Sequence, residues 1–251
     1  MTSSKRTLSK VPEVTLLFWI IKIAATTLGE TGGDMVTMSM KFGYLIGTGI
    51  FLVFFLAAVV AQIRSRTFHP VPYWLAIVAS TTVGTTMADY ADRSLGIGYA
   101  GGTSLLFALL ITSLFVWYRT LGSVAVDTVR SAKSEVFYWV TIMFSQTLGT
   151  ALGDWMASTA GFGFSGAAIV FAVLLGVVLA AYFWTNISRT TLFWAAFILT
   201  RPLGAAVGDF LDKPLHDGGL ALSRYSASAV LLLFIIGCLL IFRQRPAKIV
   251  H

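Results

Sequence analysis

Residue types that support soluble catalytic sites are scarce in this sequence. The 251 residues include one cysteine, Cys238, and three histidines, and only 12% of the residues are charged. A single cysteine allows neither an intramolecular disulfide nor a site of several thiolates for a metal. The histidines His69, His216 and His251 fall in expected loops or at the end of the chain, so they form no cluster that favours zinc. Because no nucleophile paired with a base and no cofactor fingerprint appears either, we do not expect an enzyme or a covalently bound cofactor.

Apolar residues, in contrast, make up 57% of the chain. About 20 consecutive apolar residues cross the hydrocarbon core of a bilayer as a helix. Eight such stretches are present, near residues 13–33, 42–63, 71–91, 97–118, 135–156, 163–185, 190–210 and 221–242. The first is longer than the apolar core of a signal peptide and resembles later segments, so we expect it to be retained. The sequence therefore predicts an all-α integral membrane protein whose single membrane domain spans residues 1–251.

Basic residues are distributed unequally between the two sides of these spans. Only Lys41, Arg93, Lys213 and Arg224 fall on one side. The other side carries Lys5, Arg6, Lys10, Arg64, Arg66, Arg119, Arg130, Lys133, Arg189, Arg243, Arg245 and Lys248. The positive-inside rule predicts a multi-pass protein of the cell membrane with both termini in the cytoplasm. Since the net charge of +7 lies in short loops and tails, we expect the lipid bilayer as a partner and no nucleic acid.

One motif occurs four times with identical spacing. A tryptophan is followed ten residues later by glycine and fifteen residues later by aspartate. The tryptophans are Trp19, Trp74, Trp139 and Trp194, and the aspartates are Asp34, Asp89, Asp154 and Asp209. The repeats span about 13–66, 70–122, 134–186 and 190–243, and the fourth has six extra residues after its aspartate. Such regular spacing indicates internal repetition of one two-helix unit.

The repeat resembles a family of bacterial membrane proteins that consist of four tandem repeats of unknown function, each with two transmembrane segments and a characteristic tryptophan. The resemblance covers nearly the whole chain and implies architecture, in a bacterial inner membrane, rather than an activity. Two spans per repeat give successive copies the same orientation in the membrane. We therefore expect eight transmembrane helices around a pseudo-fourfold axis, with the four motif-bearing helices inside and the other four outside.

The repeat glycine and the residue four positions later form a stripe of small residues on one face of each motif helix. The stripe comprises Gly29 and Gly33, Gly84 and Ala88, Gly149 and Gly153, and Gly204 and Gly208. Small residues at this spacing let neighbouring membrane helices approach closely. We interpret this stripe as a helix-packing face.

Each repeat aspartate shares a helix face with the residues seven and four positions before it. In the first three repeats these companions are polar: Thr27, Glu30, Thr82, Thr85, Thr147 and Thr150. A carboxylate at membrane depth costs several kcal/mol and normally faces a bundle interior or an aqueous cavity. We interpret the four aspartates, with these companions, as a cation-binding ring. The alternative is that each aspartate only caps the end of its helix.

Two basic residues lie inside the motif helices and are candidate counter-charges. Lys22 could pair with a carboxylate or extend to the cytoplasmic surface, and Arg201 could pair with Glu30 or a neighbouring aspartate. The repeat tryptophans are most simply explained as anchors at the membrane interface.

The leading functional hypothesis is membrane transport of a small inorganic cation. Oxygen ligands suit protons, sodium or a divalent metal such as magnesium or manganese. Methionines next to the aspartates, such as Met35, also leave copper(I) open. The alternatives are a pseudo-tetrameric ion channel and a membrane scaffold protein that transports nothing. These patterns select neither one metal nor one oligomeric state.

Overall fold

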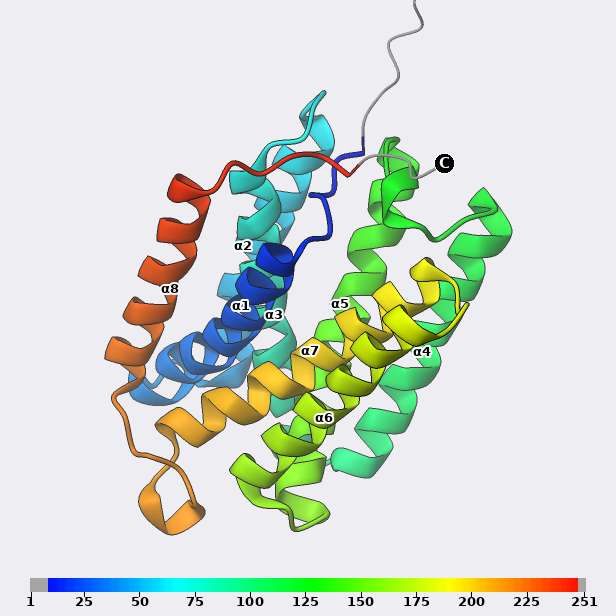
Figure 1. Cartoon of the computed structure of the whole chain (residues 1–251). Helices are drawn as coiled ribbons and strands as arrows, with labels where there is room; N and C mark the ends of the chain where they lie inside the picture. Colours follow the sequence, from blue (N-terminus) through cyan, green and yellow to red (C-terminus); the bar gives the residue numbers. More distant parts are fainter. Residues whose placement is uncertain (1–8, 248–251) are drawn as a thin grey trace, which may run out of the picture.

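The computed structural model describes residues 9–247, so Lys5, Arg6, Lys248 and His251 lie outside the described residues. Within that range the chain forms eight long α-helices, close to the predicted spans (Figure 1). They are α1 (Leu16–Asp34), α2 (Gly43–Arg64), α3 (Pro70–Asp89), α4 (Tyr99–Leu121), α5 (Ala132–Asp154), α6 (Gly163–Trp184), α7 (Arg189–Asp212) and α8 (Arg224–Ile241). The all-helical prediction is confirmed.

The first three motif helices end differently from the fourth. Each of α1, α3 and α5 ends at its repeat aspartate and continues as a five-residue π-helical turn: Met35–Ser39, Tyr90–Ser94 and Trp155–Thr159. Helix α7 instead continues past Asp209 to Asp212. Short π-helical turns are rare and occur frequently at functional sites.

The four motif helices form a closed inner ring. Helix α1 packs against α3, α3 against α5, α5 against α7, and α7 back against α1. Each remaining helix packs on the motif helix of the next repeat: α2 on α3, α4 on α5 and α6 on α7, while α8 packs on α1 and so joins the last repeat to the first. Figure 1 shows α8 and α2 on one side of the bundle and α4 and α6 on the other. The motif helices therefore lie inside, as the repeat predicted.

Five helices, α2, α4, α6, α7 and α8, are long and apolar enough to cross a membrane. In α2, α4, α6 and α8 at most 17% of the apolar window is buried, and exposed side chains such as Val53 and Phe183 are apolar. This surface suits lipid and indicates a multi-pass membrane protein. Helices α1, α3 and α5 are more polar, because their side chains face one another inside the bundle instead of the surface.

The repeat glycines lie where neighbouring inner helices touch. A Cβ atom at Gly29 would overlap Thr81, and one at Gly149 would overlap Arg201. A Cβ at Gly84 would lie 2.8 Å from the backbone of Gln146. In each case the neighbour belongs to the following repeat, seven residues after the tryptophan of that repeat. Gly204 of the last repeat contacts the equivalent residue of the first repeat, Thr26. The glycines thus allow contacts that any larger residue would prevent.

Three of the four repeat tryptophans do not act as surface anchors, so that interpretation is wrong for these three. Trp74, Trp139 and Trp194 are buried, and Trp19 is half-buried against Phe18. With neighbouring rings they form an aromatic layer across the end of the bundle opposite the aspartates: Phe18, Tyr73, Trp117, Tyr138, Phe193 and Phe197. The tryptophans lie on the inner helices, so their bulk fills the interior and not the lipid interface.

Both described ends of the chain meet at this aromatic end of the bundle (Figure 1). The N-terminal segment pairs with the C-terminal one through Ala247 N to Val11 O (2.8 Å) and Glu13 N to Arg245 O (2.8 Å). Lys10 is 8% exposed, and its Nζ lies 2.6 Å from Glu135 Oε1 on α5. The N-terminal segment is therefore packed into the fold.

Candidate functional site

The four repeat aspartates lie inside the protein. Asp34, Asp89, Asp154 and Asp209 are 0%, 2%, 4% and 2% exposed. None of the first three forms a side-chain capping hydrogen bond at the junction of its α-helix and π-helical turn. Helix capping, the simpler alternative for these residues, is therefore wrong.

Two basic side chains join the aspartates in pairs. Lys213 Nζ contacts Asp34 and lies 2.9 Å from Asp209 Oδ1. Arg93 lies 3.0 Å from Asp89 and 3.5 Å from Asp154. Each cation thus links the aspartate of its own repeat to that of the next repeat, and all four carboxylates lie close together at one end of the inner ring.

Arg93 and Lys213 belong to the sparsely charged side, and their pairing with the aspartates was not predicted from the sequence. Each stands four residues after a repeat aspartate, a spacing that brings opposite charges together on a helix. Repeats one and three carry Met38 and Ser158 at the equivalent position. This alternation was visible in the sequence and distinguishes repeats two and four from one and three.

A further ion pair extends the cluster. Arg224 Nε lies 2.8 Å from Asp212 Oδ2, and Arg224 Nη2 lies 3.8 Å from Asp34 Oδ2. Burial lowers the pKa of Lys213, but the nearby carboxylates of Asp209, Asp34 and Asp212 outweigh burial and hold it well above its usual value. Lys213 therefore stays charged at neutral pH.

Carboxylates outnumber cations in this cluster, which we name the carboxylate cluster. Its acidic members are Glu30, Asp34, Asp89, Asp154, Asp209 and Asp212, and its basic members are Arg93, Arg201, Lys213 and Arg224. With every member ionised, the net charge of the cluster is −2.

Three members of the cluster approach one another most closely. Glu30, Asp34 and Asp209 are all buried, and one carboxylate oxygen from each lies within 4.8 Å of the others. Glu30 and Asp34 come from one turn of α1, whereas Asp209 comes from α7, which packs beside α1. Of the predicted oxygen ligands, these three have suitable geometry for sharing one cation.

Arg201 connects all four inner helices. Its Nη2 atom lies 3.0 Å from Glu30 Oε2 of α1 and 2.6 Å from Thr85 Oγ1 of α3, and it contacts Thr150 Oγ1 of α5. These three partners occupy the same position in repeats one to three, four residues before the aspartate. The arginine of the fourth repeat is therefore held at the centre of the ring, 0% exposed.

Lys22 neither pairs with a carboxylate of the described residues nor extends to the surface, so both predictions for it are wrong. Its side chain is 0% exposed, so it does not extend to the surface. Its Nζ lies 4.2 Å from the centre of the Phe197 ring, and it forms no ion pair with any described residue. A cation over an aromatic face is stabilised by the ring quadrupole.

The remaining threonines contribute less than predicted. Thr27, Thr82 and Thr147 each donate to the carbonyl four residues earlier in their own helix, at 3.0, 2.8 and 3.0 Å. Thr85 instead faces its neighbours, with its Oγ1 3.2 Å from Glu30 Oε2. The predicted threonine ligands therefore form two groups: three that bond within their own helices, and Thr85 and Thr150, which contact Arg201.

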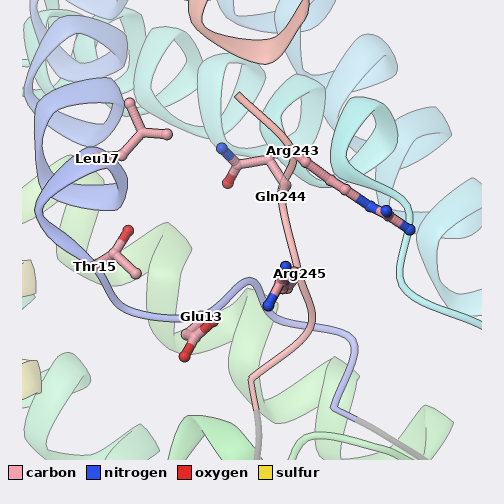
Figure 2. A pocket seen from close by; sticks show the side chains of 6 residues that line it. All are labelled: Glu13, Thr15, Leu17, Arg243, Gln244 and Arg245. Carbon is pink, nitrogen blue, oxygen red and sulfur yellow. The ribbon is translucent and has the colours of Figure 1, made fainter. Parts of the chain in front are cut away.

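A pocket of about 270 Å³ lies at the opposite end of α1. Figure 2 shows Glu13, Thr15 and Leu17 across from Gln244 and Arg245, while the Arg243 side chain points away from them. It has no residue in common with the carboxylate cluster.

A family described as "Repeat of Unknown Function (DUF347)" matches the chain four times, at residues 17–68, 72–123, 137–188 and 192–245. The chain belongs to this repeat family. The matched segments coincide with the four repeats found from the tryptophan, glycine and aspartate spacing. No curated protein and no solved structure is detectably similar to the chain.

Proposed function

We propose that this DUF347 repeat protein transports a cation across the membrane through the carboxylate cluster. The observation that carries the proposal is the excess of six buried carboxylates over four cationic side chains within the carboxylate cluster. Buried charge of one sign is costly unless it is compensated, so such a cluster favours a cation. Charged groups within membrane helices commonly mark the path of an ion.

We also propose an arrangement of the chain in the membrane. All eight helices cross the bilayer of a bacterial inner membrane around a pseudo-fourfold axis, with both termini in the cytoplasm. The cyclic packing of the inner helices supports the axis, and the basic residues near the aromatic end support the orientation. The carboxylate cluster then lies toward the external side.

A transporter fits the interior better than an open channel. Arg201 stands on the axis between the four inner helices, and the aromatic layer fills the cytoplasmic end. A fixed positive charge at a constriction opposes cation passage. Movement of a cation would therefore require Arg201 to shift, as in a conformational cycle.

Glu30 links the cluster to Arg201. The same carboxylate accepts from Arg201 Nη2 and lies within 4.8 Å of Asp34 and Asp209 oxygens. A cation that draws on Glu30 competes with Arg201 for it and weakens the central contact. Through this competition, a cation that binds at the carboxylate cluster favours a conformation in which Arg201 has moved away from the centre of the inner ring.

Flux into proteoliposomes tests the proposal, with protons, sodium, potassium, magnesium, calcium and manganese supplied in turn. We expect saturable uptake of at least one cation and its loss in Asp34→Asn and Asp209→Asn. Asp217→Asn is the matched control, because its side chain is 54% exposed and lies outside the cluster.

Three results would count against the proposal. Linear, non-saturating current would favour the channel alternative. Absence of flux for every cation with a correctly folded protein would favour the scaffold alternative. Equal loss in all three variants would mean that the carboxylate cluster has no special part in transport.

A further inference from the structure

We propose that Glu30, Asp34 and Asp209 form a binding site for a hard divalent cation, and that Lys213 is a tethered competitor for this site. This inference names the substrate class of the proposed transport function and in that sense rests on it. The binding claim, however, can be tested without measuring transport.

The first support is the ligand geometry. Each of the three residues offers a carboxylate oxygen, and these oxygens lie within 4.8 Å of one another. Oxygens on opposite sides of a calcium ion are separated by about 4.6–5.2 Å, and neighbouring ligands lie closer. The three oxygens could therefore surround one ion of this size with small movements. A ligand set of oxygen alone favours magnesium, calcium or manganese over softer metals.

The second support is a buried oxygen without a partner. Asp34 is 0% exposed, and its Oδ1 atom has no hydrogen-bond partner among residues 9–247. Its Oδ2 atom is the one that contacts Lys213 and lies 3.8 Å from Arg224. Since an unpaired buried carboxylate oxygen is unfavourable, it indicates a further positive ligand at this position.

The third support is the position of Lys213. Its ammonium group contacts Asp34 and lies 2.9 Å from Asp209 Oδ1, so the protein itself places a cation between two of the three ligands. Lys213 is the first residue after α7, at the start of the loop that is longer in the fourth repeat. Movement of this loop would withdraw the ammonium group without changing the inner helices.

Charge balance favours a divalent ion over a monovalent one. This half of the cluster contains four carboxylates, from Glu30, Asp34, Asp209 and Asp212. When Lys213 is withdrawn, Arg201 and Arg224 remain, and the ionised groups carry a net charge of −2. A divalent cation neutralises that charge, whereas a monovalent cation leaves one buried carboxylate uncompensated.

The other half of the cluster provides an internal comparison. Arg93 joins Asp89 and Asp154 as Lys213 joins Asp209 and Asp34, from the same position in its repeat. The residue equivalent to Glu30 is a threonine there, and no third carboxylate among the described residues completes a group. We therefore assign the cation to the half built by α1 and α7.

Equilibrium binding of manganese to the purified full chain in nanodiscs tests the assignment. Free manganese is measured by electron paramagnetic resonance, and magnesium and calcium are added as competitors. We expect one bound manganese per chain, and a gain in affinity of at least about tenfold in Lys213→Met, because the competing charge is removed. Asp34→Asn should lower the affinity by a similar factor. A gain in affinity cannot result from misfolding, so Lys213→Met keeps the test informative if Asp34→Asn is unstable.

Lys133→Met is the matched control, since it removes an exposed ammonium group of α5 that lies outside the carboxylate cluster. Its manganese affinity should stay within about twofold of wild type, well below the tenfold change. Equal gains in Lys213→Met and Lys133→Met, or no manganese binding in wild type and Lys213→Met, would overturn the assignment. Manganese binding without flux would support the cation site and refute transport. Sodium or proton flux without manganese binding would support transport and refute the cation site.

Discussion

The contact between Gly149 and Arg201 offers the sharpest test of how the inner ring is held together. In Gly149→Ala the new Cβ would overlap the Cβ and Cγ atoms of Arg201. Arg201 has little freedom to move aside, because its guanidinium is bound to Glu30, Thr85 and Thr150 at the same time. The strain must therefore separate α5 from α7 or break those hydrogen bonds.

The expected magnitude follows from the space at each glycine. Overpacking a tight interior costs about 1–3 kcal/mol, and we expect Gly149→Ala at the upper end. A Cβ at Gly153 would lie 3.2 Å from the Cβ of Ala205, which predicts a cost of about 1 kcal/mol. Gly176 on α6 has nothing within 4 Å of a new Cβ, so Gly176→Ala should change stability by no more than about 1 kcal/mol, in the stabilising direction expected of alanine in a helix.

Thermal unfolding of the three variants in detergent, followed by size-exclusion chromatography, measures the series. At about 2–4 °C per kcal/mol, Gly149→Ala should lower the Tm by about 6–12 °C and Gly153→Ala by about 2–4 °C. Gly176→Ala is the matched control for the alanine substitution itself. If Gly149→Ala unfolds at the same temperature as Gly176→Ala, the close approach of α5 and α7 is refuted.

Three further predictions concern topology and buried ion pairs. Reporter domains fused after Arg66 or Arg130 should be cytoplasmic, and an external signal at either point would contradict the parallel arrangement of the repeats. Lys10→Met should lower the free energy of unfolding by about 3–5 kcal/mol, since it leaves the carboxylate of Glu135 buried without its partner. The double variant with Glu135→Gln should recover most of that loss, and no recovery would argue against the ion pair. Arg201→Met should destabilise by about 3–5 kcal/mol for the same reason, and a wild-type Tm would show that the central contact is dispensable.

Much of the architecture follows from local sequence patterns. Apolar runs of membrane-spanning length gave the eight helices, because helix length and hydrophobicity are properties of single segments. The spacing of Trp19, Gly29 and Asp34, repeated three more times, gave the repeats and the inner position of the motif helices. The π-helical turns after Asp34, Asp89 and Asp154 were not predicted, since neither composition nor periodicity distinguishes them from the end of an α-helix.

The site was predicted in part, and the errors in that prediction have one physical cause. The four aspartates were correctly recognised as candidates for a shared interior position, but their partners were missed. The spacing of four residues could have revealed the aspartate of the same repeat as a partner of Arg93 and of Lys213. Only the fold, however, brings the aspartate of the following repeat to each of them. Pairing between repeats depends on which helices are neighbours in the fold, and a single sequence does not contain this information in its local patterns.

The sequence alone determined the helices, the repeat and the identity of the charged residues, because each depends on residues close together in the chain. Only the tertiary structure decided how those charges are shared. Packing of α7 against α1 joins Asp209 to Asp34 and Glu30, and the closed ring places Arg201 against three other helices. Packing likewise determined where the repeat tryptophans lie, because an indole ring is suited both to a lipid interface and to an interior aromatic layer. Charge compensation and burial are properties of neighbours in space, and in this fold those neighbours come from different repeats.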